Sequence, residues 1–183
     1  MNDVEYLKSL LGVYPDFPKK GVVFQDFIPI MRDPVAFETL ITHFMHHITS
    51  HTLRNSQSSK IDVVVGLDAR GFLLGPILAL RLGAAFVPVR KQGKLPGKCT
   101  TASFEKEYGT DSFEMQSDSI KPGQTVVVID DLIATGGSAK AAGELVAKQG
   151  GKTIEYLFVI GLPFLNGHEK LDAPSYSMIQ ASD

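Results

Sequence analysis

Residues 126–142 read VVVIDDLIATGGSAKAA and combine two kinds of chemistry. A β-branched run leads directly into two adjacent carboxylates, Asp130 and Asp131. A turn of small residues follows and opens a helical pattern; it consists of Ala134, Thr135, Gly136, Gly137 and Ser138. Glycines let backbone N–H groups converge on one point, and a helix N-terminus adds partial positive charge. This phosphate turn (residues 134–138) therefore predicts a binding site for a monophosphate.

The acid pair beside an anion site indicates a ligand with distinct parts. Carboxylates accept hydrogen bonds from vicinal sugar hydroxyls, and they hold Mg²⁺ directly or through water. A phosphate on the turn, with ribose and metal on Asp130 and Asp131, satisfies both features. Two simpler interpretations stay open: a tight turn with Ser138 as helix N-cap, and a solvated acidic pair at a strand end. The turn matches neither GxxxxGK[ST] nor GxGxxG.

Alternating strands and helices must position these residues. Four apolar runs, at 61–67, 84–89, 125–130 and 153–162, are too continuous for half-exposed strands. Helical patterns at 71–82 and 138–149 lie between them. Such runs are typical of a parallel sheet covered on both faces, so we expect an α/β fold with a mainly parallel central sheet flanked by helices. Ligands bind beyond the carboxyl ends of such strands.

Other segments lie outside this alternation. Residues 33–51 predict an amphipathic helix and 52–60 an exposed connector. Three histidines of this helix follow i, i+4, i+8 spacing: His43, His47 and His51. They lack matching acids, so we interpret them as surface residues and not as metal ligands. We expect one domain over 1–183, with a small hood from about 1–30 and 162–183. Residues 92–124 form a long excursion that we interpret as a mobile lid containing a possible hairpin.

The totals exclude several classes of protein. A length of 183 residues, 44% hydrophobic and 21% charged, predicts one globular domain with a real core. The net charge of −2 gives no global attraction to nucleic acid or to an anionic membrane. The single cysteine, Cys99, permits no internal disulfide and favours a reducing compartment. Residues 71–89 contain Arg81 and two prolines and predict a buried helix and strand. We expect a cytoplasmic protein without nucleic-acid or membrane partners.

The stretch VVVIDDLIATGGS resembles the phosphoribosyl pyrophosphate fingerprint of the type I phosphoribosyltransferases. Four more segments resemble the adenine phosphoribosyltransferases of that family in the same order: PDFPKKGVVFQDF (15–27), VGLDARGFLLGP (65–76), VPVRKQGKLPG (87–97) and EKEYGTDSFEMQ (105–116). The resemblance covers nearly the whole chain. It implies the type I phosphoribosyltransferase fold and a homodimeric, Mg²⁺-dependent enzyme of purine salvage. Its substrates would be adenine and phosphoribosyl pyrophosphate, and its products AMP and pyrophosphate.

Two basic features suit the pyrophosphate of such a ligand. GLDARG (66–71) places an arginine after a strand, where its guanidinium fork and backbone amides could bind phosphate oxygens. In the family, the peptide between the residues matching Ala69 and Arg70 is often cis. RKQGKLPGK (90–98) carries four cations without an acid, which indicates a polyanionic partner. The predicted pyrophosphate-binding residues are Ala69, Arg70, Arg90, Lys91 and Lys94. Lys98 is as well explained by an idle loop, and nucleic acid is a weaker rival ligand.

The resemblance also implies catalytic and base-binding residues. Glu107 and Tyr108 match the catalytic segment, and Glu107 would relay a proton at the adenine ring. The residues alone do not separate Glu107 from Glu105. A closing lid would exclude water from the oxocarbenium-like state at C1 of the sugar. The adenine-binding residues implied by the resemblance are Val23, Phe24, Gln25 and Leu162.

Two positions depart from the family pattern. The family usually has arginine at the position of Gln25 and glutamate at that of Gly161, so the details of base contacts stay open. Two other functions remain as alternatives. One is the sensor domain of a nucleic-acid regulator, which binds phosphoribosyl pyrophosphate without catalysis. The other is a transferase acting on hypoxanthine, guanine or orotate.

Overall fold

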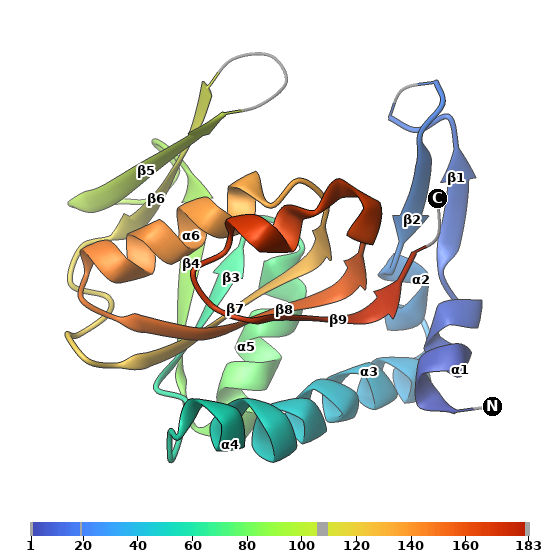
Figure 1. The fold of residues 1–183 in the computed structure, drawn as a ribbon, viewed down its shortest axis with the longest axis horizontal. Helices are drawn as coiled ribbons and strands as arrows, with labels where there is room; N and C mark the ends of the chain where they lie inside the picture. The colour runs from blue at the N-terminus through green and yellow to red at the C-terminus, as the bar shows by residue number, and fades with distance from the viewer. Residues whose placement is uncertain (1, 19, 106–109, 182–183) are drawn as a thin grey trace.

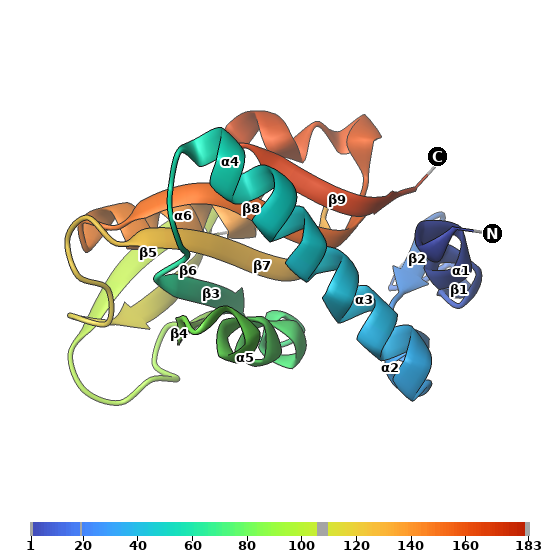
Figure 2. The same ribbon diagram turned by 90° about the horizontal axis from the view of Figure 1, so that it is seen from below.

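The computed structural model describes residues 2–18, 20–105 and 110–181. The centre of the fold is a seven-stranded sheet with the strand order β5-β6-β4-β3-β7-β8-β9 (Figures 1 and 2). Its strands are β3 (Val63–Leu67), β4 (Ala85–Lys91), β5 (Cys99–Glu105), β6 (Thr110–Gln116), β7 (Thr125–Ile133), β8 (Lys152–Gly161) and β9 (Ser175–Gln180). Strands β4, β3, β7, β8 and β9 run parallel, whereas β6 is antiparallel to both β4 and β5. The predicted α/β fold with a mainly parallel sheet is confirmed.

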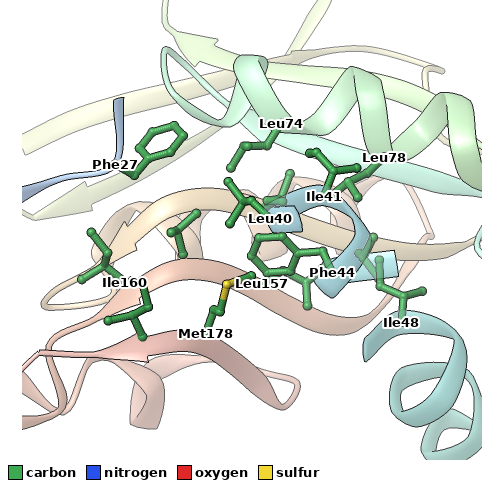
Figure 3. Packing of buried hydrophobic residues seen from close by; sticks show 14 of the residues in the cluster. Phe27, Leu40, Ile41, Phe44, Ile48, Leu74, Leu78, Leu157, Ile160 and Met178 are labelled. Carbon is green, nitrogen blue, oxygen red and sulfur yellow. The ribbon is translucent and has the colours of Figure 1, made fainter. Parts of the chain in front are cut away.

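Helices cover both faces of this sheet, as Figure 2 shows. Helices α3 (Pro34–His47) and α5 (Gly71–Leu82) pack on one face, and α6 (Gly137–Lys148) packs on the other. Side chains alternate along a strand, so Val64 and Val127 join the α3–α5 cluster while Val63 and Val126 join the α6 cluster. This double burial explains the continuous apolar runs. Figure 3 shows the α3–α5 cluster, in which Phe44, Leu74 and Leu157 are fully buried.

The helix that begins after Asp33 is longer than predicted. Asp33 caps α3 through its side chain, and the chain continues through a π-helical turn (Ile48–Thr52) into α4 (Leu53–Ser56). The predicted connector at 52–60 is therefore helical as far as Ser56, although Arg54 and Asn55 within it are exposed as predicted. Thr52 is only 3% exposed, because its hydroxyl donates to the Glu155 carboxylate on β8. Among the described residues, no helix has both the length and the apolar character needed to cross a membrane.

The segments predicted to form a hood take two different places. The N-terminal one contains α1 (Asp3–Ser9), the antiparallel pair β1 (Gly12–Pro15) and β2 (Val23–Asp26), and α2 (Ile28–Met31). The C-terminal one forms two 3₁₀ turns (Pro163–Leu165 and Gly167–Lys170) and then β9, which pairs with β8 in the central sheet. Leu7 of α1 and Met178 of β9 share the α3–α5 cluster, so both segments pack on the main core.

The excursion at 92–124 contains regular structure. Strands β5 and β6 pair from Cys99↔Gln116 to Glu105↔Thr110, so the possible hairpin is present. It joins the sheet through β4 and also contacts α6, where Lys148 Nζ donates to the Thr101 carbonyl at 2.6 Å. The mobility of this segment stays a prediction, and Glu107 and Tyr108 lie outside the described residues.

Candidate functional site

The phosphate turn lies between the end of β7 and the start of α6. The structure begins α6 at Gly137 and makes Gly136 its N-cap, with φ +77° and no side-chain capping bond. Ser138 is therefore not the cap that the simpler interpretation required. An open hollow of about 190 Å³ adjoins the turn, and its lining includes the whole turn together with Asp130 and Phe158. Uncapped N–H groups at a helix N-terminus beside a hollow are suited to bind an anion.

A close backbone contact fixes the shape of the turn. A Cβ added to Gly136 would lie 2.2 Å from the carbonyl oxygen of Gly167, and one added to Gly167 would lie 2.2 Å from that of Ala134. The connection between β8 and β9 therefore presses directly on the phosphate turn. Glycine is required at both positions by this approach, and at Gly136 also by its positive φ.

The strand that carries the acid pair is longer than the predicted run at 125–130, because β7 extends to Ile133 and both acids lie within it. Pairing of β7 with β3 stops at Gly66↔Ile129, whereas pairing with β8 continues to Ile133↔Gly161. Asp130 and Asp131 therefore occupy the part of β7 that extends past β3, where one strand edge is free. Continued pairing with β8 is the reason that the strand does not stop at the acids.

The two carboxylates have different surroundings. Asp130 lines the hollow of the phosphate turn and accepts a hydrogen bond from the Asp131 backbone N–H at 2.9 Å. Asp131 is 8% exposed and accepts a bond from Arg70 Nη1 at 2.7 Å. Burial, followed by the neighbouring Asp131 carboxylate, raises the pKa of Asp130 well above its ordinary value. A cation that binds Asp130 must therefore compete with a proton.

Arg70 lies at the centre of the described contacts. It follows β3, pairs with Asp131, and places its guanidinium carbon 5.0 Å from the ring centroid of Phe24 on β2. The structure thus brings together a predicted pyrophosphate residue, a predicted ribose residue and a predicted adenine residue. The cis peptide lies between Asp68 and Ala69, one bond earlier than the family pattern suggested.

The basic segment 90–98 is held by acids that the sequence reasoning gave no role. Arg90 Nε donates to Asp68 Oδ2 at 2.7 Å, and Lys91 Nζ lies 3.4 Å from Asp111 Oδ2. The backbone N–H groups of Lys94 and Leu95 both donate to Glu114 Oε1. Lys98 is exposed.

The predicted adenine residues approach the site from two segments. Val23, which is 59% exposed, and Phe24 come from β2, next to Gln25, whose Oε1 is buried without a hydrogen-bond partner. Leu162 lines a second open hollow of about 310 Å³, which shares Ile133 and Ala134 with the hollow of the phosphate turn. The second hollow therefore adjoins the first.

Comparison with known proteins identifies the family. Residues 37–180 match the family model described as the phosphoribosyl transferase domain. The chain belongs to the phosphoribosyltransferase family. Among its relatives, the adenine phosphoribosyltransferase of Yarrowia lipolytica is 57% identical over 97% of this chain and 95% of its own length. Adenine phosphoribosyltransferase 1 of Saccharomyces cerevisiae is 51% identical over 96% and 91% of the two chains.

Solved phosphoribosyltransferase structures have the same fold. The Saccharomyces cerevisiae adenine phosphoribosyltransferase, complexed with adenine and an imino-altritol bisphosphate, superposes with a TM-score of 0.91 at 50% identity, covering 97% of this chain and 98% of that one. The Trypanosoma brucei adenine phosphoribosyltransferase, in complex with AMP, pyrophosphate and ribose-5-phosphate, gives 0.84 at 26% identity, covering 98% and 80%. The family predicted from the motifs is confirmed.

The acids that hold the basic residues of this phosphoribosyltransferase were not predicted from the sequence. Asp68 stands in a motif that was noticed for its arginine, and Asp111 and Glu114 stand on β6 within the predicted lid. Arg90 faces Glu114 only because β4 and β6 pair in that register. Opposite charges on two strands predict a contact only after the register of the strands is known.

Proposed function

We propose that this chain is an adenine phosphoribosyltransferase: it transfers the 5-phosphoribosyl group of phosphoribosyl pyrophosphate to adenine and forms AMP and pyrophosphate. The observation that carries the proposal is the position of the acid pair. Asp130 shares a hollow with the phosphate turn while Asp131 holds Arg70, so one ligand with two phosphate-bearing ends fits the arrangement. A relative that is 57% identical and is named adenine phosphoribosyltransferase supports the choice of base.

The reaction replaces one bond at C1 of the sugar by another. Adenine N9 forms a bond to C1, and the bond from C1 to the pyrophosphate oxygen breaks with its electron pair leaving on pyrophosphate. The proton lost from the base passes to Glu107, assisted by Tyr108. The phosphate turn binds the 5-phosphate through its N–H groups and the hydroxyls of Thr135 and Ser138. Pyrophosphate is bound by the Ala69 amide and by the cations Arg70, Arg90, Lys91 and Lys94.

The acid pair fits a magnesium ion that arrives with the ligand. Mg²⁺ prefers six oxygen ligands and usually keeps several waters or phosphate oxygens. Asp130 and Asp131 supply carboxylate oxygens, and no cluster of three metal-binding side chains occurs among the residues that the structure describes. The remaining ligands would be ribose hydroxyls, phosphate oxygens and water. When bound, the ion would neutralise charge on the leaving pyrophosphate.

The base site combines the N-terminal segment with the end of β8. Phe24 supplies an aromatic ring, Val23 and Gln25 supply backbone groups, and Leu162 supplies apolar surface. A side chain at Gly161, such as the glutamate usual in the family, would require Ser177 and Gln180 to shift, because a Cβ there would lie 2.8 Å from Ser177 Cβ and 2.9 Å from Gln180 Oε1. The proposal also includes a homodimer, a cytoplasmic location, a hood and a closing lid; light scattering after size exclusion tests the dimer.

The deciding experiment is product formation by purified protein with phosphoribosyl pyrophosphate and Mg²⁺. Adenine, hypoxanthine, guanine and orotate are supplied separately, and we expect AMP from adenine alone. Chelation of Mg²⁺ should abolish turnover, and Glu107→Gln should depress it without loss of folding. Another preferred base would overturn the choice of adenine. Binding of phosphoribosyl pyrophosphate without any product would favour the sensor function, which a gel shift with generic DNA would then examine.

A further inference from the structure

Glu114 is a buried acid beside the basic segment that we assign to pyrophosphate. It is 4% exposed and stands on β6, opposite Arg90 of β4 and Thr101 of β5. A carboxylate in such a place is costly unless hydrogen bonds and charges compensate it. The groups that compensate this carboxylate therefore indicate its role.

The compensating groups come from the turn after β4. Glu114 Oε1 accepts hydrogen bonds from the backbone N–H of Lys94 at 2.8 Å and of Leu95 at 2.7 Å. Burial acts to raise the pKa of Glu114. The pKa nevertheless lies below its ordinary value, because the carboxylate accepts from the amides of Gly93, Leu95 and Lys94 and lies near the charge of Arg90. The carboxylate is therefore ionised at neutral pH and organises the turn as an anion.

Arg90 holds the same turn from the other side. Its Nη1 donates to the Lys94 carbonyl at 3.2 Å while its Nε donates to Asp68 at 2.7 Å. The N–H of Lys94 is thus fixed by Glu114 and its carbonyl by Arg90. Asp68 precedes Ala69 and Arg70 directly, so the network joins the basic segment to the other predicted pyrophosphate residues.

We propose that Glu114 is a positioning residue for the pyrophosphate half of the site, which sets the turn at 92–95 so that Lys91 and Lys94 act on the ligand together. This inference rests on the proposed function. Glu114 acts through the backbone and through Arg90, and it does not touch the ligand. A merely structural acid would affect every ligand alike, whereas a positioning residue of this kind acts selectively on pyrophosphate.

The test compares ligands that do and do not contain pyrophosphate. Isothermal titration measures Kd for Mg²⁺-pyrophosphate and for AMP, and steady-state rates give KM for phosphoribosyl pyrophosphate and for adenine. The variants are Glu114→Ala and Glu114→Gln. The matched control is Glu38→Ala, which removes a carboxylate that is 58% exposed and paired with Arg81. Thermal unfolding verifies that each variant is folded.

We expect Glu114→Ala to weaken pyrophosphate binding and raise KM for phosphoribosyl pyrophosphate about tenfold or more, because bonds to a charged acceptor are lost. Kd for AMP and KM for adenine should stay within about twofold of wild type. Glu114→Gln keeps an acceptor oxygen but not the charge, so we expect a smaller weakening of about threefold for pyrophosphate alone. The Glu38→Ala control should match wild type in all four constants.

Two results would overturn the inference: equal weakening of pyrophosphate and AMP, or unchanged pyrophosphate affinity. If the alanine variant does not fold, the glutamine variant decides by the same comparison. Failure of the wild-type protein to form AMP would count against the proposed function instead. The pyrophosphate titration needs no turnover, so the two failures are distinguishable.

Discussion

Replacing Gly136 with alanine is the sharpest test of the phosphate turn. The new Cβ would lie 2.2 Å from the Gly167 carbonyl oxygen, well inside van der Waals contact, in a residue whose φ is +77°. Both the backbone strain and the steric conflict would distort the turn. Gly83, at the end of α5, supplies a matched control, because its φ is +64° and its Cβ would meet nothing within 4 Å.

The control separates the two contributions to the free energy of unfolding. Alanine in the left-handed region costs about 1–2 kcal/mol, which is all that Gly83→Ala should lose. Gly136→Ala has the same strain plus the conflict with a backbone atom that cannot rotate away, and overpacking of this kind costs about 1–3 kcal/mol more. We therefore expect Gly136→Ala to be destabilised by about 2 kcal/mol more than Gly83→Ala.

Urea unfolding and steady-state rates of AMP formation provide the readouts. Because Gly136 belongs to the turn, its variant should also raise KM for phosphoribosyl pyrophosphate, whereas Gly83→Ala should leave KM unchanged. Equal losses of stability in the two variants would refute the close approach of the β8–β9 connection. An unchanged KM in a folded Gly136→Ala protein would refute the assignment of the 5-phosphate to this turn.

Charged groups give three more predictions. Asp131→Asn should lower turnover about a hundredfold or more but change the free energy of unfolding by only about 1 kcal/mol, because its partner Arg70 is 36% exposed; near-normal turnover would remove Asp131 from the mechanism. Glu155→Gln removes a buried charge that lies 3.1 Å from His47 Nε2, so urea unfolding should show a loss of about 1–3 kcal/mol without a change in KM. Burial, and then the charge of His47, lower the pKa of His43 from its ordinary 6.5. Below about pH 6.5 the unfolded chain therefore binds more protons at this residue than the folded chain does. The free energy of unfolding should be greatest above about pH 6.5 and should decrease as the pH falls. His43→Gln should flatten this profile, and an unchanged slope would contradict the reasoning.

The strands and their layers were predictable because burial of a strand on both faces requires a continuous run of apolar residues. The run at 61–67 predicted β3, observed as Val63–Leu67, and every residue of that strand is buried. The family was predictable because a phosphate turn needs small residues and free N–H groups, which restricts the residue types it can contain.

Features set by pairing between distant segments were not predictable. The helical segment that starts with α3 continues past residue 51 into α4, and the Thr52 hydroxyl within it donates to Glu155, which is 103 residues away in the chain. The histidines interpreted as surface residues are instead partly buried at two positions, where His43 Nε2 lies 2.7 Å from Tyr176 Oη and His47 contacts Glu155. Helical periodicity predicts which residues share one face of a helix, but it does not predict which polar residue of another segment contacts that face.

The role of the acids beside the anion site was not predictable either, because it depends on contacts between distant segments. Three of the predicted cations each have an acidic partner in the structure: Arg70 with Asp131, Arg90 with Asp68, and Lys91 with Asp111. These pairs orient the cations and limit the self-repulsion of a concentrated positive charge. In the proposed reaction, phosphate oxygens would take over the cations while Mg²⁺ and ribose hydroxyls would take over the acids at β7. Binding would then replace the Arg70–Asp131 ion pair by two new contacts, so entry of metal and polyanion together would leave both of these charges paired.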